Sequence, residues 1–273
     1  MALKNILVHV TDTAQSKLRL ETAVALCGAH DAHLTGLGVR AVPNMPPYSV
    51  GTIPDIVSGP FAAQQTAAVA AARTAFEDAV SRAGWTDRSS WLELEGNVTE
   101  IIALHARYVD LTVTGQDTQE REPFEISTID LVLRSGRPVL VTPYDAAYKP
   151  IGKRIAVAWN GSREAARAVS DAMPLLVAAD RVEVVSIAAD IPSDVPGTDI
   201  ATHLAQHGVS VELKLLADTA NDPGATLLDY VGDSGADMIV MGAYGRSRLS
   251  EWVFGGVTRH VLREMRVPVL MSH

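Results

Sequence analysis

The residue types best suited to binding chemistry gather in one segment, residues 242–258. Glycine lets a backbone approach a ligand closely, and the free amides at the start of a helix form an anion site that the helix dipole strengthens. Phosphate is therefore the natural ligand of a glycine-rich segment that leads into a helix. The glycines and the hydroxyl concerned are Gly242, Gly245, Gly255, Gly256 and Thr258.

Charged side chains in the same segment fit an anionic ligand. Arg246 and Arg248 can supply countercharge to a phosphate, and the hydroxyl of Thr258 can donate from the first helical turn. The segment has no Gly-Lys-Ser/Thr run and no GxGxxG spacing, which excludes a Walker A loop and a dinucleotide fingerprint. The alternative, in which the glycines serve only a tight turn and close helix packing, stays open.

The elements around this segment are typical of a parallel sheet covered on both faces. In the second half of the chain, continuous apolar strands alternate with amphipathic helices. In such a sheet, a strand-to-helix connection lies in the crevice at the carboxyl ends of the strands. The predicted strands are 154–159, 181–187, 210–216, 237–242 and 267–271, and the predicted helices follow Ser162 or span about 199–207, 223–234 and 256–265.

The chain repeats this plan once. Three pairs of segments match, so we predict two tandem domains, residues 1–145 and 153–273, separated by Thr142 to Gly152. Each domain is expected to be α/β, a five-stranded parallel open sheet flanked by helices. The matching segments are 5–12 with 154–160, 110–115 with 237–242, and 137–141 with 267–271.

The first half contains an insertion. Residues 41–60 hold five prolines and are expected to form an irregular loop, or alternatively a lid over a ligand. Pro60 is then expected to open a long alanine-rich helix that ends before Gly84.

The spacing Gly242-x2-Gly245-x9-Gly255, followed by Gly256, Val257 and Thr258, resembles the nucleotide signature of the universal stress proteins. Because the repeat covers essentially the whole chain, the resemblance is to the tandem form of that family. It implies an adenine nucleotide alpha hydrolase-like fold with strand order 3-2-1-4-5. It also implies ATP, with Mg²⁺, bound across the carboxyl ends of the first and fourth strands.

The resemblance assigns roles to the matching residues. Gly242 and Gly245 would face the triphosphate and ribose, and Asn160 corresponds to the family aspartate that meets the adenosine end. The phosphate oxygens would be held by Gly255, Gly256, Val257 and Thr258, with Arg246 as countercharge. No residue is assigned a catalytic or metal-binding role.

Two departures from the family pattern predict weaker nucleotide binding. Gly256 replaces a Ser/Thr that donates a hydroxyl, a loss of about 1 kcal/mol, and Asn160 replaces a carboxylate. The first half departs further from the family pattern. Gly115 is followed by Gln-Asp, and residues 125–130 contain acidic side chains in place of the glycines of the phosphate loop. Asp12 is still present at the end of the first strand of that half. We therefore expect the first half to be a nonbinding partner of the second.

Composition argues against nucleic-acid-binding and membrane-spanning proteins. The chain has 273 residues, and its 23 Lys and Arg against 32 Asp and Glu give a net charge of 23 − 32 = −9. An acidic chain lacks the basic surface that nucleic acid requires, and no apolar run approaches the ~18 to 20 residues of a membrane span. With no signal-peptide pattern and a single cysteine, Cys27, which fits a core position, we expect a cytoplasmic protein.

The favoured function is therefore a cytosolic ATP-binding stress or signalling protein that acts on a protein partner the sequence does not identify. Two alternatives stay open: a slow ATPase, for which Glu251 is the carboxylate nearest in sequence, and a nucleotide-free scaffold or binder of another small molecule. The two halves are expected to pack as an internal pseudo-dimer through Pro138–Val141 and Pro268–Met271, because apolar edge strands tend to pair. Further homo-oligomerisation is compatible with this arrangement.

Overall fold

The computed structural model describes residues 2–42, 55–117, 126–144, 150–188, 197–217, 222–244 and 256–273. The chain divides into two compact units, which we call the first unit (residues 3–135) and the second unit (residues 136–273). Every strand pair within a unit is parallel except one.

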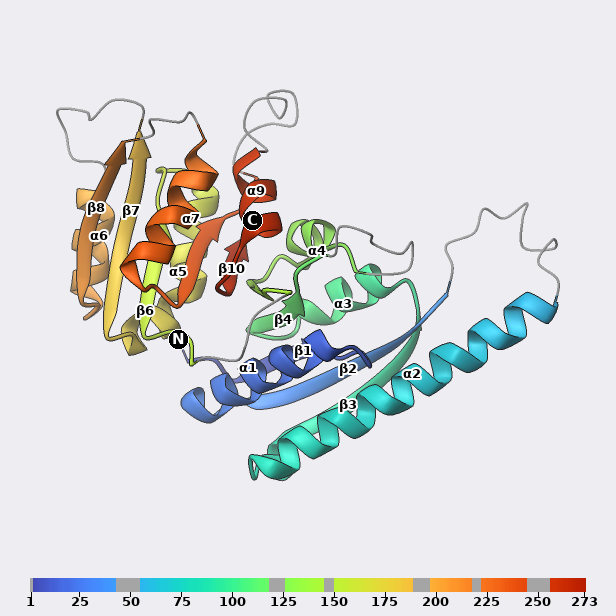
Figure 1. The fold of residues 1–273 in the computed structure, drawn as a ribbon. Coiled ribbons are helices and arrows are strands. Elements are labelled where there is room, and N and C mark those ends of the chain that lie inside the picture. The colour runs from blue at the N-terminus through green and yellow to red at the C-terminus, as the bar shows by residue number, and fades with distance from the viewer. Residues whose placement is uncertain are drawn as a thin grey trace. The chain divides into compact units, whose positions relative to one another are not determined.

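The first unit is a parallel sheet in the order β3-β2-β1-β4. Helices α1 and α2 lie on one side of these strands and α3 and α4 on the other, as Figure 1 shows. In chain order the elements are β1 (Asn5–His9), α1 (Ala14–His30), β2 (His33–Ala41), α2 (Asp55–Arg82), a short 3-10 helix (Thr86–Arg88), β3 (Ser89–Gly96), α3 (Val98–Ala106), β4 (Leu111–Gly115) and α4 (Thr128–Ser135).

The predicted start of the long helix was wrong. Helix α2 begins at Asp55, five residues before Pro60, which therefore lies inside the helix. A proline at this position has no amide hydrogen, so the helix lacks one backbone hydrogen bond, to the carbonyl of Ile56. Helix α2 is held by an apolar stripe between Val69 and Val80 that packs on β2 and β3. Residues 43–54 of the predicted loop lie outside the described residues.

The second unit contains the predicted five-stranded order and one additional strand. Its sheet runs β5-β10-β9-β6-β7-β8. Read from β8 to β10, these five strands have the predicted order 3-2-1-4-5. Helices α7 and α9 lie in front of this sheet in Figure 1, and α5 and α6 lie behind it. The elements are β5 (Val139–Thr142), β6 (Arg154–Ala158), α5 (Arg163–Ala178), β7 (Arg181–Ala188), α6 (Thr198–Gln206), β8 (Val211–Ala217), α7 (Pro223–Ser234), β9 (Met238–Gly242), α9 (Gly256–Glu264) and β10 (Val269–Ser272).

The additional strand is the last strand of the first sequence half. Strand β5 pairs antiparallel with β10, and Leu140 lies opposite Leu270 in the register. The predicted pairing of these two segments is therefore present. It also explains why the compact units divide after Ser135, since β5 packs with the second unit. The domain limits 1–145 and 153–273 remain a prediction about the repeated sequence.

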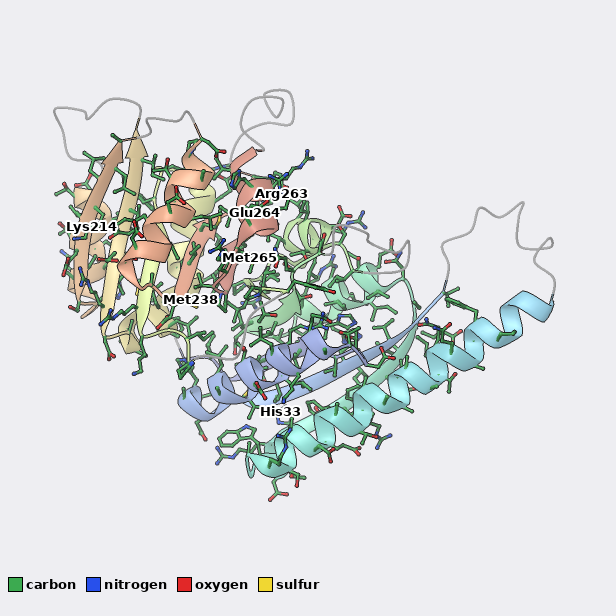
Figure 2. All side chains as sticks on the ribbon, in the orientation of Figure 1. His33, Lys214, Met238, Arg263, Glu264 and Met265 are labelled. Atoms are coloured by element: carbon green, nitrogen blue, oxygen red, sulfur yellow. The ribbon has the colours of Figure 1, made fainter. Side chains whose placement is uncertain are left out.

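Burial separates the core from the charged edge of the second unit. Met238 of β9 is fully buried and Met265 nearly so, whereas Lys214 lies on the outermost strand β8 and pairs with Glu212 at 3.1 Å (Figure 2). In the first unit Cys27 is buried in α1, as predicted, and burial raises the pKa of its thiol to about 12. A thiol with such a pKa stays protonated and unreactive. Among the described helices, none combines the length and apolar character needed to span a membrane.

Candidate functional site

The predicted site lies at the carboxyl ends of β6 and β9. These strands are direct neighbours, with Ala158 opposite Met241 at their last shared register position. The chain leaves β6 into α5 and leaves β9 toward α9, and these helices cover opposite faces of the sheet. A crevice at such a reversal is the usual ligand position in open α/β sheets.

Asn160 follows β6 and shapes the turn into α5. Its side-chain Oδ1 accepts a hydrogen bond from the Ser162 amide at 3.1 Å, and Ser162 Oγ accepts from the Ala165 amide at 3.1 Å. The first is an Asx turn and the second caps α5. The Asn160 side chain is exposed at this edge, where a ligand could reach it.

Gly242 allows β9 to approach the start of α5. A Cβ at this position would lie 2.4 Å from the amide nitrogen of Ala165 and 2.4 Å from the carbonyl carbon of Glu164. Both neighbours are backbone atoms, so no side-chain rotation relieves the clash. The close-packing alternative raised from the sequence therefore applies to Gly242.

Helix α9 begins at Gly256, which matches the predicted start. Gly256 is exposed, Val257 is half-buried, and the side chain of Thr258 is 5% exposed in the first turn. Among the described residues, no side chain accepts a hydrogen bond from the amides of this first turn. The other predicted residues of this segment lie outside the described residues: Gly245, Arg246, Arg248, Glu251 and Gly255.

A polar contact that the sequence analysis missed joins α7 to α9. Asp222 Oδ1 accepts from the amides of Gly224 and Ala225 at 3.1 Å, and its Oδ2 lies 3.1 Å from Nδ1 of His260. The Asp-Pro-Gly run signals the helix cap in sequence. The partner of Asp222 on α9 has no sequence signal, because it depends on how the two helices pack.

The first unit has a matching site, and an internal carboxylate fills it. The amide of Thr128, at the start of α4, donates to Asp117 Oδ1 at 2.9 Å, and the Thr128 hydroxyl also hydrogen bonds to Asp117. That hydroxyl lies 3.1 Å from the carbonyl of Gly115 at the end of β4. Next to it, the Ser127 amide donates to Thr99 Oγ1 at 2.9 Å. A carboxylate thus occupies the position where a helix start would hold a phosphate.

The strand ends of the two units match with a register different from the one the sequence suggested. Thr11 and Asn160 each stand two residues before the helix N-cap, Thr13 or Ser162. Asp12 lies one residue further on and is exposed. Thr11, and not Asp12, is therefore the structural counterpart of Asn160.

Comparison with known proteins identifies the second half. Residues 152–273 match the model of the Universal stress protein family. A universal stress protein of Synechocystis sp. is 36% identical over 67 residues, which are 24% of this chain and 22% of that protein. The chain thus matches less than a quarter of that relative's length.

Two solved structures extend the comparison. A universal stress protein from Archaeoglobus fulgidus aligns over 98% of this chain and 95% of its own, with a TM-score of 0.74 and 16% identity. A universal stress protein in complex with cAMP covers 44% of this chain and 96% of its own, with a TM-score of 0.36 and 21% identity. The first likeness shows the fold of the whole chain. The second half, residues 152–273, thus matches the Universal stress protein family, and the whole chain shares the fold of a member of that family.

Proposed function

We propose that the second unit binds one ATP at the carboxyl ends of β6 and β9, and that the protein acts as a cytosolic stress or signalling binding protein. Nucleotide occupancy would change a surface that another protein reads. The first unit binds no nucleotide in this proposal.

The observation that carries the proposal is the contrast between the two helix starts. In the first unit the carboxylate of Asp117 takes the amide and the hydroxyl of Thr128. In the second unit Thr258 stands nine residues before the segment 267–271, as Thr128 stands nine residues before the matching segment 137–141. Thr258 is 5% exposed, and no described side chain caps the first turn of α9. Helix amides that no described side chain caps, together with the helix dipole, favour an anion at α9, whereas a fixed carboxylate repels one at α4.

The residues available suit an adenine nucleotide. Amides of Gly256 and Val257 and the hydroxyl of Thr258 would hold phosphate oxygens, and Asn160 offers both a donor and an acceptor to the nucleoside. Three further residues carry the proposal from sequence alone: Gly245, Arg246 and Gly255. Mg²⁺, when bound with ATP, would neutralise part of the phosphate charge.

A substitution that copies the first unit tests the proposal. Tyr244 stands two residues after Gly242, as Asp117 stands two residues after Gly115, and Tyr244 has φ 56°. Asn and Asp are the side chains that tolerate this left-handed conformation best. In Tyr244→Asp a carboxylate would compete with phosphate, while Tyr244→Asn keeps the backbone preference without the charge.

Calorimetric titration with Mg-ATP measures the outcome. We expect one site per chain in the unmodified protein, at least tenfold weaker binding in Tyr244→Asp, and a much smaller loss in Tyr244→Asn. A stoichiometry of two, or equal affinity of the Asp and Asn variants, would contradict the proposed site.

A further inference from the structure

The first unit holds a buried cation with few partners. Arg19 of α1 is 5% exposed, and its Nη2 donates to Thr11 Oγ1 at 2.8 Å. Its Nε is buried and has no acceptor among the described residues. One turn further along the same helix, Thr22 Oγ1 is also buried without a partner among those residues.

No carboxylate in the described part of the chain compensates this charge. Among the described residues, no Asp or Glu lies within ion-pair distance of the Arg19 guanidinium. Burial lowers the pKa of Arg19 to about 10, so the side chain still carries its positive charge at neutral pH. A buried charge without a partner is unfavourable, and proteins that keep one generally supply a counterion.

The guanidinium lies where an open α/β sheet presents its ligand crevice. Thr11 follows β1, Gly115 ends β4, and these strands are neighbours in the sheet. A Cβ at Gly115 would lie 3.4 Å from Arg19 Nη1, so the guanidinium rests against the end of β4. Arg19 therefore places its charge between the ends of two strands at the point where the strand order reverses.

The fold itself does not require a cation at this position. Arg19 stands six residues after the N-cap Thr13, and the same distance after Ser162 brings the chain to Ala168. Ala168 is fully buried in the second unit, which builds the same strand order without a charge there. The arginine is a feature of the first unit alone.

We infer that the first unit binds a small oxyanion, a carboxylate or a phosphate, at the strand ends next to Arg19. The guanidinium supplies the countercharge and Nε a directed donor, a geometry that suits planar oxyanions. Because Asp117 fills the start of α4, this ligand is held by a side chain and not by helix amides. The inference does not depend on ATP binding in the second unit.

The test is the response of thermal stability to anions in the full-length protein. A ligand that binds only the folded state raises the melting temperature as its concentration rises. Titrations with acetate and with inorganic phosphate at constant ionic strength distinguish a carboxylate site from a phosphate site. Chloride, an anion without oxygen, is the control. We expect a saturable rise with at least one oxyanion and none with chloride.

Two variants assign the response to Arg19. Arg19→Met should lose it, with at least tenfold weaker binding, and Arg19→Lys should retain part of it because the charge remains. Arg73→Met, which removes an exposed arginine paired with Glu77 on α2, serves as the matched control and should respond as the unmodified protein does. A melting temperature insensitive to both oxyanions, or an unchanged response in Arg19→Met, would overturn the inference.

Discussion

At the scale of single residues, the roles of Gly242, His9 and Arg19 follow from backbone proximity and burial. Gly242 is fixed by a packing contact with the start of α5, although the sequence pattern presented it as part of a binding loop. His9 and Arg19 are buried polar groups that no periodicity reveals. His9 ends an apolar strand, and Arg19 lies on a buried face of α1 that also carries Ser16 and Thr22. Substitutions at Gly242 and His9 test these roles.

Gly242→Ala should destabilise the second unit by about 1–3 kcal/mol, because the added methyl meets backbone that cannot move without shifting a helix. Urea unfolding measures the change. The control is Gly232→Ala in α7, where a Cβ meets no atom within 4 Å and helix propensity favours alanine. Equal stability of the Gly242→Ala protein would show that β9 and α5 are not packed this closely.

His9 should make the protein sensitive to acid. Burial, with a smaller effect of the Arg19 charge, lowers the pKa of His9 from 6.5 to about 3. Between these values the unfolded chain binds a proton that the folded chain does not, so stability is complete above pH 6.5 and falls by up to about 1.4 kcal/mol per pH unit toward pH 3.

Replacement of this histidine should flatten that dependence. We expect His9→Leu to lose less stability between pH 6.5 and pH 4 than the unmodified protein, measured by denaturant unfolding at each pH. His33→Asn is the control, since His33 lies at the start of β2 in contact with Ser90 (Figure 2). Parallel pH profiles for His9→Leu and the unmodified protein would contradict the assigned cause.

At the scale of elements, β5 of the first sequence half pairs with β10 of the second. Leu140 and Leu270 are opposite one another and almost completely buried. A charge at either position would be placed in the core without a partner, which costs several kcal/mol. We therefore expect the pair to make the folding of the two halves depend on one another.

Leu270→Asp should therefore lower the stability of both halves together, seen as one unfolding transition at lower denaturant concentration. Leu262→Asp, which changes α9 away from the β5 contact, should act mainly on the second unit and so provides the comparison. Two well-separated transitions in the unmodified protein, or separately expressed halves that are each monomeric and as stable as the whole, would argue against the coupling.

At the scale of the whole molecule, the function we propose is binding and not turnover. Efficient phosphoryl transfer needs a positioned water, a metal held by side chains and charge stabilisation at the transition state. Within the described residues, no group of three or more His, Cys, Asp or Glu side chains is arranged to hold a metal ion. Holding ATP and presenting a surface, the two functions that we propose, do not require such a group of side chains.

ATP hydrolysis by the purified protein should accordingly be much slower than the ~1–100 s⁻¹ typical of kinases. Single-turnover measurements with labelled ATP and excess protein separate slow chemistry from slow product release. Turnover within the kinase range would make the protein an enzyme and overturn the binding interpretation.

Most elements and their order could be predicted from the amino-acid sequence. Apolar strands such as residues 237–242 and helices such as 223–234 were predicted within one or two residues, because hydrophobic periodicity and caps act locally. The repeat also pointed to the pairing of residues 138–141 with 268–271, since an apolar edge strand needs a partner. The start of α2 was predicted wrongly from Pro60, because a proline can stand at a helix start or, as here, five residues inside the helix.

Which side chains contact one another could not be predicted, because it depends on how the elements pack. Asp117 and Thr128 are 11 residues apart in the chain, and Asp222 caps α7 whereas His260 lies on α9. Their contacts follow from packing. The register that equates Thr11 with Asn160 likewise depends on the helix caps and not on the nearest carboxylate in sequence. Local pattern sets secondary structure, but the contacts that fill or free an anion site join residues distant in the chain, and a single sequence carries no local signal for them.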